Sequence, residues 1–264
     1  MVWRRLRPSA GRGREIAGNT GDWIDDNLMC GRYKLTAHEK WLSDLFNLDP
    51  EDVDWAARWN VAPTQEVATV RQDSKTPRRI FGLMKWGLIP YWARDTSMAP
   101  KAINAMSETA AEKPTFSDPM RKRRCLIPAD GFYEWKRTGA KSKQPYNIGL
   151  ADGGLFAFAG LWDRWKDAAG RETKTCTILT TAANSLVQDV HNRMPVILRP
   201  EDYDLWLDPG VTDPRKVIDL LKPLDARLMR KYPVSEAVNR VANDGPECAE
   251  EVEVDEGDKQ LKLL

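Results

Sequence analysis

The chain contains few of the residues that build metal sites and disulfide frameworks. Only four cysteines and two histidines occur among its 264 residues, and no two cysteines form a Cys-x-x-Cys pair. Zinc sites are typically built from such pairs or from clustered histidines. The sequence therefore predicts no metal site, and four scattered cysteines are typical of reduced thiols inside a cell.

Long apolar runs and a strong net charge are also missing. No secretory h-region opens the sequence, no run of 18 apolar residues occurs in it, and its formal net charge is +1. These features argue against a membrane span and against a uniformly basic nucleic-acid-binding protein, so any polyanion site has to be a local patch. We expect a monomer in the cytoplasm, associated with the nucleoid if the source is bacterial.

The two ends of the chain differ in composition from the middle. Residues 1–29 are rich in Arg, Gly and Pro at their start and show no hydrophobic period, which predicts a disordered extension or a start codon assigned too early. A basic nucleic-acid-binding arm or a targeting segment is the alternative. Acidic residues dominate from 244 to 258, so we expect an acidic tail over 247–264 and one domain over 30–246.

The middle of the chain predicts an α+β domain around a mainly antiparallel, partly barrel-like β-sheet with short flanking helices. Thr36 and Glu39 form a capping box ahead of an apolar helix period, which predicts a helix over 37–46. Further short helices are expected at 107–112, 183–190, 201–207 and 214–221. Strand patterns cover 67–71, 79–86, 125–135, 146–150, 155–165 and 175–181, with hairpin turns at 139–143 and 167–170.

Chemistry is first suggested by Met29-Cys30-Gly31-Arg32, which has the form of a translation start. If Met29 is the first residue and is trimmed, Cys30 carries an amine and a thiol on adjacent carbons. That pair condenses with an aldehyde and closes a five-membered ring, which no internal cysteine can do. The alternative is an ordinary buried cysteine.

Three further segments place polar side chains in apolar or tight stretches. They are Ile103–Thr109, Ala129–Trp135 and Val190–Pro195. Glu134 is the clearest case, because it lies between Tyr133 and Trp135 in a predicted strand, where an unpaired carboxylate is costly. His191 is one of only two histidines and is close to Arg193.

With these segments in view, the sequence resembles the SRAP (SOS-response-associated peptidase) family of abasic site processing proteins. The matching motifs are Met29–Arg32, Asn104–Thr109, Ala129–Trp135, His191–Pro195, Trp59–Pro63, Trp86–Pro90 and Tyr232–Ser235. They occur in the family's order and spacing over about 30–246. One departure is Met106, where the family has an arginine associated with DNA contact, and this puts one phosphate contact in doubt.

The resemblance implies a role in the DNA damage and SOS responses, without metal or cofactor. Family members shield abasic sites in single-stranded DNA, at replication forks, and cross-link to them covalently through the N-terminal cysteine. Lyase-type and autopeptidase activities are also associated with the family. By this resemblance Cys30 forms a thiazolidine with the sugar aldehyde, Glu134 transfers protons, His191 is a second acid or base, and Asn104 orients the sugar or the cysteine.

The resemblance also implies a DNA-binding set. Arg32 and Arg193 are the expected phosphate clamps, because guanidinium binds phosphate in a bidentate way. The expected groove residues are Asn60, Pro63, Trp86, Pro90, Tyr91, Trp92 and Thr180. The basic run 121–124 extends a basic track in one interpretation and is a solvated surface run in the other.

Structural alternatives accompany these assignments. In these alternatives, Glu134 has no catalytic role and is simply paired with a basic side chain. His191 then caps a helix or lies in the core, and Asn104 caps the helix expected at 107–112. Most of the eleven tryptophans are interpreted as core, among them Trp41, Trp162 and Trp206. Cys125 and Cys176 are likewise interpreted as core residues, and Cys248 as part of the tail.

Two other functions compete with cross-linking. One is a cysteine peptidase that uses a dyad of Cys30 and His191. The other is a protein that binds single-stranded DNA without any covalent bond.

Overall fold

The computed structural model describes residues 30–73, 75–140 and 142–254. The strands are β1 (Arg32–Leu35), β2 (Arg58–Val61), β3 (Glu66–Gln72), β4 (Arg79–Trp86), β5 (Asn104–Met106), β6 (Arg124–Ala129), β7 (Gly131–Arg137), β8 (Lys143–Leu150), β9 (Phe156–Lys166), β10 (Glu172–Ala182), β11 (Arg193–Pro195), β12 (Ile197–Leu198) and β13 (Met229–Pro233). The α-helices are α1 (Glu39–Phe46), α2 (Ser117–Lys122) and α3 (Tyr203–Leu207). Short 3-10 turns are η1 (Pro50–Asp52), η2 (Ala99–Lys101), η3 (Pro200–Asp202), η4 (Pro214–Lys216), η5 (Ile218–Leu220), η6 (Ala226–Leu228), η7 (Glu236–Asn239) and η8 (Pro246–Cys248).

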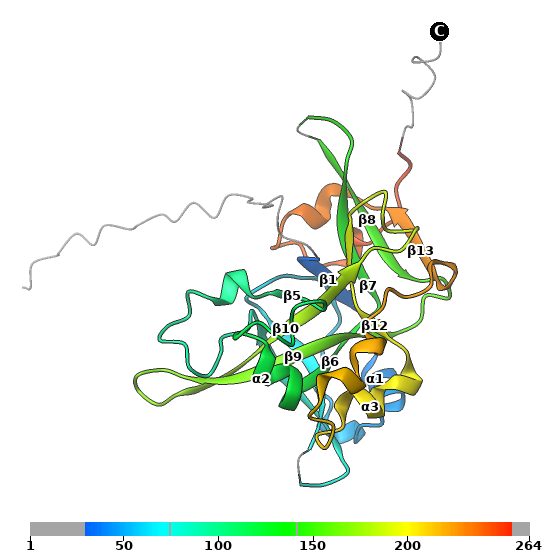
Figure 1. The fold of residues 1–264 in the computed structure, drawn as a ribbon. Helices are drawn as coiled ribbons and strands as arrows, with labels where there is room; N and C mark the ends of the chain where they lie inside the picture. The colour runs from blue at the N-terminus through cyan, green and yellow to red at the C-terminus, as the bar shows by residue number, and fades with distance from the viewer. Residues whose placement is uncertain (1–29, 74, 141, 255–264) are drawn as a thin grey trace, which may run out of the picture.

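Five strands close into a barrel in the order β10, β4, β3, β6 and β9 (Figure 1). All of these pairings are antiparallel except that of β4 with β10. The side chains of Tyr33, Trp86 and Phe158 meet edge to face in the core, and all three are buried. Burial of such large rings is a main source of stability in a core of this size.

A second sheet lies against the barrel in the order β13, β8, β7, β1 and β2 (Figure 1). Its neighbouring strands are all antiparallel. The helices are few and short, so the prediction of an α+β domain with a mainly antiparallel, partly barrel-like sheet is confirmed. The strands predicted at 67–71, 79–86, 146–150, 155–165 and 175–181 are also confirmed as β3, β4, β8, β9 and β10.

The single strand predicted over 125–135 is wrong, because the run divides at Asp130 into β6 and β7. β6 belongs to the barrel and β7 to the second sheet. The Asp130 carboxylate binds the ammonium of Lys34 at 2.9 Å and both the backbone N–H and the hydroxyl of Thr36. These bonds fix the corner at which the chain passes from one sheet to the other.

The same contacts correct the predicted capping box. Thr36 is bound to Asp130, and His38 caps α1 instead, with its Nδ1 accepting from the backbone N–H of Lys40. The helices predicted at 107–112 and 183–190 are turns, and 214–221 consists of η4 and η5. The helix predicted at 201–207 is present as η3 followed by α3.

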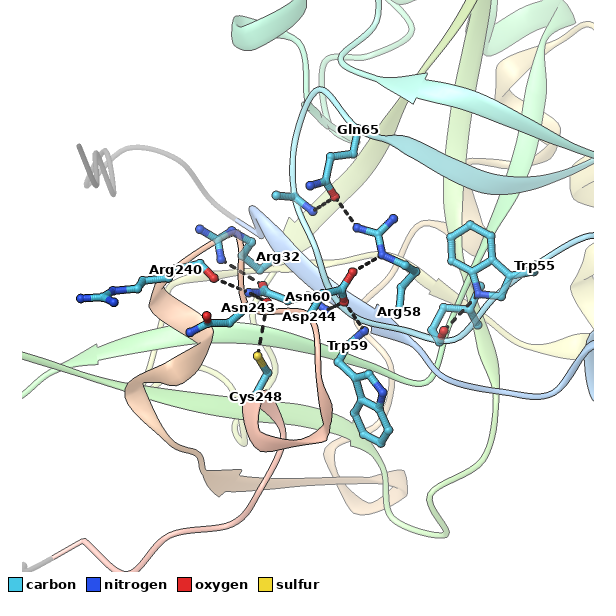
Figure 2. Close-up of polar contacts among 12 residues, drawn as sticks. Arg32, Trp55, Arg58, Trp59, Asn60, Gln65, Arg240, Asn243, Asp244 and Cys248 are labelled. Atoms are coloured by element: carbon cyan, nitrogen blue, oxygen red, sulfur yellow. Dashed lines mark hydrogen bonds and ion pairs between the residues drawn. The ribbon is translucent and has the colours of Figure 1, made fainter. Parts of the chain in front are cut away.

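The start of the predicted acidic tail is part of the fold. The Asp244 carboxylate accepts the backbone N–H groups of Trp59 and Asn60 and pairs with Arg58 (Figure 2). Cys248 is fully buried, and Glu251 forms a β-bridge with Val234. The tail prediction is therefore wrong for 247–254, while 255–264 lies outside the described residues. The same is true of residues 1–29, on which the prediction of an extension falls.

The tryptophans divide between core and surface. Trp206 is fully buried and Trp162 is partly buried, but Trp41 on α1 is 64% exposed, so its interpretation as a core residue is wrong. Cys125 and Cys176 are buried in the core as predicted. In the described ranges we find no helix with the length and apolar character needed to cross a membrane.

The Asp244 network predicts a measurable loss of stability. Asp244→Ala leaves two backbone N–H groups without their acceptor, one of them on the buried residue Asn60. We expect the free energy of unfolding in urea to fall by about 1–3 kcal/mol. Asp219→Ala is the control, since Asp219 is 82% exposed and pairs with the exposed Lys222, and it is expected to cost about 0.5 kcal/mol or less. Equal effects of the two substitutions would contradict the structural role of Asp244.

Candidate active site

Two of the three polar segments singled out in the sequence meet at the end of β10. Residues 178–180 of β10 pair in parallel with Asn104–Met106 of β5. On its other edge, residues 180–182 pair with Arg193–Pro195 of β11. The sheets thus bring Asn104, Glu108 and Arg193 to one end of the barrel, although these residues are up to 89 positions apart in the chain.

Cys30 meets Glu134 through the pairing of β1 with β7. Arg32 lies opposite Tyr133, and continuing that antiparallel register brings Glu134 opposite Gly31. The backbone N–H of Cys30 donates to Oε1 of Glu134 at 2.7 Å. Cys30 has a left-handed φ of 45°, and both residues are buried, with exposed fractions of 2% and 4%. The nitrogen that would become the N-terminal amine is therefore next to a carboxylate inside the protein.

Burial sets the proton affinities of this pair. Burial raises the pKa of Glu134, while the nearby His191 and hydrogen bonds from Cys30 and the Trp135 backbone lower it, with a net rise. Burial and the Glu134 carboxylate raise the pKa of the Cys30 thiol well above 9.0, and Arg193 opposes this. A carboxylate in this setting holds a proton more readily than usual, which suits a group that both donates and accepts protons.

His191 and Arg193 lie in the turn that leads into β11. Nδ1 of His191 accepts the backbone N–H of Arg193 at 3.1 Å, which fixes the ring beside the strand. The Arg193 guanidinium binds both oxygens of Glu108, at 2.5 and 2.8 Å, and donates to the backbone oxygen of Thr180 at 2.7 Å. The residue before His191 belongs to a turn, so the helix-capping interpretation of this histidine is wrong.

Asn104 begins β5 and is opposite Ile178 of β10. Its structural alternative, the N-cap of a helix at 107–112, is wrong because that segment forms turns. The orienting role of Asn104 therefore stays a prediction, and its strand position at the end of β10 is compatible with that role.

Arg32 and Asn60 hold the C-terminal segment of the domain. Nη1 of Arg32 donates to Oδ1 of Asn60 at 2.9 Å and to the backbone oxygen of Val238 at 2.7 Å. The amide of the fully buried Asn60 donates to the backbone oxygens of Arg240 and Asn243 (Figure 2). It also donates to the backbone oxygen of Val238. The guanidinium of Arg32 is therefore committed to an internal network, and Asn60 has no surface to offer to DNA here.

The other predicted groove residues divide into buried and exposed groups. Trp86, Pro90 and Thr180 are buried, and the indole N–H of Trp86 donates to the backbone oxygen of Ile103 at 2.8 Å. Their place in a DNA-binding groove stays a prediction, because all three side chains are buried in this structure. Tyr91 and Trp92 are 61% and 49% exposed and are available for stacking, and Pro63 is half-buried.

The basic run 121–124 forms neither a continuous track nor a solvated surface run. Arg124 is buried and donates to the backbone oxygens of Trp206 and Asp208. Arg123 pairs with Asp118 and Asp163. Only Arg121 and Lys122 are exposed, so both interpretations fail for the second half of the run.

Sequence reasoning missed two polar residues of this region and one supporting it. Glu108 is within a quoted motif, but nothing in the chain indicated that it pairs with Arg193, 85 positions away. Asp130 is in another quoted motif and orders Thr36 and Lys34. Asp244 was assigned to the acidic end of the chain on composition alone. Among the residues that the structure describes, no group of three or more His, Cys, Asp or Glu side chains is arranged to hold a metal ion.

The buried position of Glu134 predicts how stability changes with pH. Since the pKa of Glu134 is raised in the folded state, Glu134 holds its proton to higher pH in the folded protein than in the unfolded chain. The contribution of Glu134 to wild-type stability therefore falls as pH rises above the ordinary pKa of 4.5, and Glu134→Gln is spared that loss. We expect the free energy of unfolding of Glu134→Gln, relative to wild type, to increase between about pH 4.5 and pH 8 in urea titrations.

The control for this measurement is Glu51→Gln, which replaces an exposed glutamate. It reports the effect of removing one carboxylate from the surface, against which the Glu134→Gln curve is compared. A constant difference for Glu134→Gln would contradict a raised pKa at that position.

The chain is similar to several known proteins over most of its length. The abasic site processing protein YoqW of Bacillus subtilis is 45% identical over 225 residues, which cover 84% of this chain and 99% of YoqW. The abasic site processing protein HMCES of Gallus gallus is 34% identical over 209 residues, 70% of this chain and 61% of HMCES. A crystal structure of a Bacteroides thetaiotaomicron protein matches with a TM-score of 0.75 and 28% identity, covering 84% of this chain and 100% of that one. Residues 29–241 match the family described as SOS response associated peptidase (SRAP), and the chain belongs to that family.

Proposed function

We propose that this protein recognises abasic sites in single-stranded DNA and forms a covalent thiazolidine cross-link to them through Cys30. The observation that carries the proposal is the backbone nitrogen of Cys30, buried at 2.7 Å from the Glu134 carboxylate in the middle of the family's motifs. The relatives named abasic site processing proteins support the same substrate. The substrate is the aldehyde form of the abasic deoxyribose.

The reaction needs a free amine and a thiol on one residue. The amine adds to the aldehyde carbon, and loss of one water molecule gives an imine. The thiol sulfur then adds to the imine carbon, its proton passes to the nitrogen, and the thiazolidine ring closes. Water is the only by-product. An α-amine has an ordinary pKa of about 7.7–8.0, so part of it is unprotonated near neutral pH. Ring closure is intramolecular and gains a large effective concentration.

Glu134 is the proton-transfer group in this scheme. It is within hydrogen-bond distance of the reacting nitrogen, and its raised pKa suits the protonation of the departing hydroxyl and the later acceptance of a proton. His191 is a second acid or base near the sugar, supported by its electrostatic effect on Glu134. Proton transfer by His191 to the leaving phosphate would account for a lyase-type activity.

Two exposed aromatic side chains are suited to hold a single strand. Tyr91 and Trp92 are exposed next to each other, and stacking of a base on such a ring contributes about 1–3 kcal/mol. Arg193 is the proposed phosphate clamp of the site. The net charge of +1 leaves these local contacts to provide the affinity.

A cysteine peptidase is the second candidate, because a peptidase of this kind needs a thiolate rather than a free amine. The raised pKa of the Cys30 thiol disfavours a thiolate at neutral pH. Nδ1 of His191 also accepts a backbone N–H. Chemical capping of the Cys30 amine separates the two functions, since it abolishes cross-linking and spares a thiol-dependent peptidase.

The residues before Cys30 control the reaction. As long as residue 29 is attached, the nitrogen of Cys30 is an amide and cannot attack an aldehyde. Translation from Met29 with removal of that methionine, or proteolytic removal of 1–29, by the protein itself or by another, supplies the free amine. Mass spectrometry of the native N-terminus identifies which form exists in the cell.

The first test compares the full chain with a chain that starts at Met29. Each is mixed with single-stranded DNA carrying one abasic site and run on a denaturing gel. We expect a shifted band only from the chain with a free Cys30 amine, because the imine requires that nitrogen. A full chain that keeps Met1 and still cross-links would overturn the mechanism.

Two cysteine variants sharpen this test. Cys30→Ser is expected to lose the boiling-stable band, since an oxygen ring is more easily hydrolysed, whereas Cys125→Ala, a core substitution, retains it. A boiling-stable band at wild-type level from Cys30→Ser would exclude the thiazolidine. Equal binding of intact and abasic strands without any stable band would favour the non-covalent DNA-binding protein.

Glu134→Gln tests the proton-transfer role separately. We expect the rate of cross-linking to fall about 100-fold, which is the lower range for loss of a general acid or base. Non-covalent binding of single-stranded DNA, measured by fluorescence anisotropy, is expected to be unchanged. Glu51→Gln is the matched control, and a wild-type rate for Glu134→Gln would remove Glu134 from its role.

A further inference from the structure

The Arg193 guanidinium is occupied by a carboxylate of the same chain. Its two terminal nitrogens donate to the two oxygens of Glu108, at 2.5 and 2.8 Å. Nη2 also donates to the backbone oxygen and, at 3.2 Å, to the hydroxyl of Thr180. The Arg193 side chain is only 12% exposed, whereas Glu108 is 46% exposed. Glu108 therefore binds Arg193 from the solvent side.

Carboxylate and phosphate bind the same edge of a guanidinium. Each accepts two parallel N–H bonds from the terminal nitrogens. The remaining nitrogen of Arg193, Nε, is buried and has no hydrogen-bond partner among the described residues. A phosphate therefore has no second edge to approach, and it reaches Arg193 in this way only by replacing Glu108.

Arg193 does not depend on Glu108 for its position. β11 fixes its backbone by pairing with β10, and the Thr180 oxygen holds Nη2 from the interior. Glu108 lies in the turn after β5, so its side chain can rotate into water. The family has an arginine at the position of Met106, which could pair with Glu108 in place of Arg193. Met106 is 40% exposed but uncharged, so in this chain it does not compete with Arg193 for Glu108.

We propose that Glu108 is a specificity-determining residue that competes with DNA phosphate for Arg193. The proposal rests on the proposed function, because it assumes that Arg193 binds a phosphate of the strand. A carboxylate held in the same chain competes at high effective concentration. An intact strand must displace Glu108 using non-covalent contacts alone and binds weakly. A strand with an abasic site is retained by its covalent bond to Cys30 and is selected for that reason.

The test measures non-covalent binding of an intact, fluorescein-labelled single strand by anisotropy. The full chain is used, since its Cys30 nitrogen is an amide and cannot cross-link. We expect Glu108→Gln to bind the intact strand about fivefold more tightly than wild type, which corresponds to release of one well-formed ion pair. Thermal unfolding monitors the folding of each variant.

Two further variants show where the gain originates. Glu112→Gln removes the same charge from the same turn, and Glu112 is exposed with no ion pair among the described residues, so we expect less than about a twofold change. In an Arg193→Gln background, Glu108→Gln is expected to give no gain, because the competed guanidinium is absent.

The outcomes separate this inference from the proposed function. Wild-type or weaker binding by Glu108→Gln would overturn the inference and make Glu108 a positioning residue for Arg193. A gain that persists with Arg193→Gln, or that Glu112→Gln reproduces, would also overturn it, as a general charge effect. If no variant binds the strand while the Met29-started chain still cross-links abasic DNA, the inference fails alone. If neither binding nor cross-linking occurs, both fail.

Discussion

The pairing of β1 with β7 is the constraint on which the site depends. Side chains alternate across a strand, so a shift of one residue in this register would move Glu134 away from Cys30. The register is held from both faces. Tyr33 and Phe132 pair within the buried core on one face, and Lys34 on the other face binds Asp130 at the start of β7. Core packing on one face and the polar corner on the other therefore fix the contact between Cys30 and Glu134, although neither residue belongs to those two groups of contacts.

The site contains a buried carboxylate, that of Glu134, in contact with Cys30. A carboxylate as buried as Glu134 loses its hydration and must recover that energy from hydrogen bonds. The bond from the Cys30 nitrogen and the nearby His191 supply part of it, and the net effect still raises the pKa of Glu134. The left-handed φ of Cys30 belongs to the chain in which residue 29 is still attached, because an N-terminal residue has no φ. Two ionisable side chains that are buried next to each other, each with a raised pKa, are typical of a reactive centre.

Much of the fold was predictable from the sequence, because strands such as β3 and β4 carry their own apolar patterns. The errors occur where a distant residue changes a local preference. Thr36 looks like a helix cap, but Asp130, 94 positions away, binds it. Asp244 looks like part of an acidic tail, but it accepts two backbone N–H groups of β2.

In the candidate site, too, residues marked by a local pattern could be predicted, and contacts between distant residues could not. Cys30, Glu134 and His191 were identifiable by their motifs and by the cost of a carboxylate in a strand. The pairing of Glu108 with Arg193 was not, because no local pattern connects residues 85 positions apart. Helical spacing predicted that Trp41 lies in the core, but α1 presents it to solvent. The buried face of α1 carries Leu42 and Phe46, and one such apolar face is enough to anchor a short helix.

The two arginines expected to bind phosphate differ in what a phosphate would have to displace. Arg32 donates to backbone oxygens of Val238 and Asn239, and it shares Asn60 with the segment that Asp244 secures. A phosphate could take those bonds only by loosening the C-terminal part of the fold, which is expensive. Arg193 is bound by a side chain on an exposed turn, and its interior bond to Thr180 survives the exchange. The guanidinium of Arg193 is already oriented, and it is close enough to Cys30 to affect the pKa of the thiol. Because only the exposed partner has to be exchanged, Arg193 is the better candidate of the two for the proposed phosphate contact.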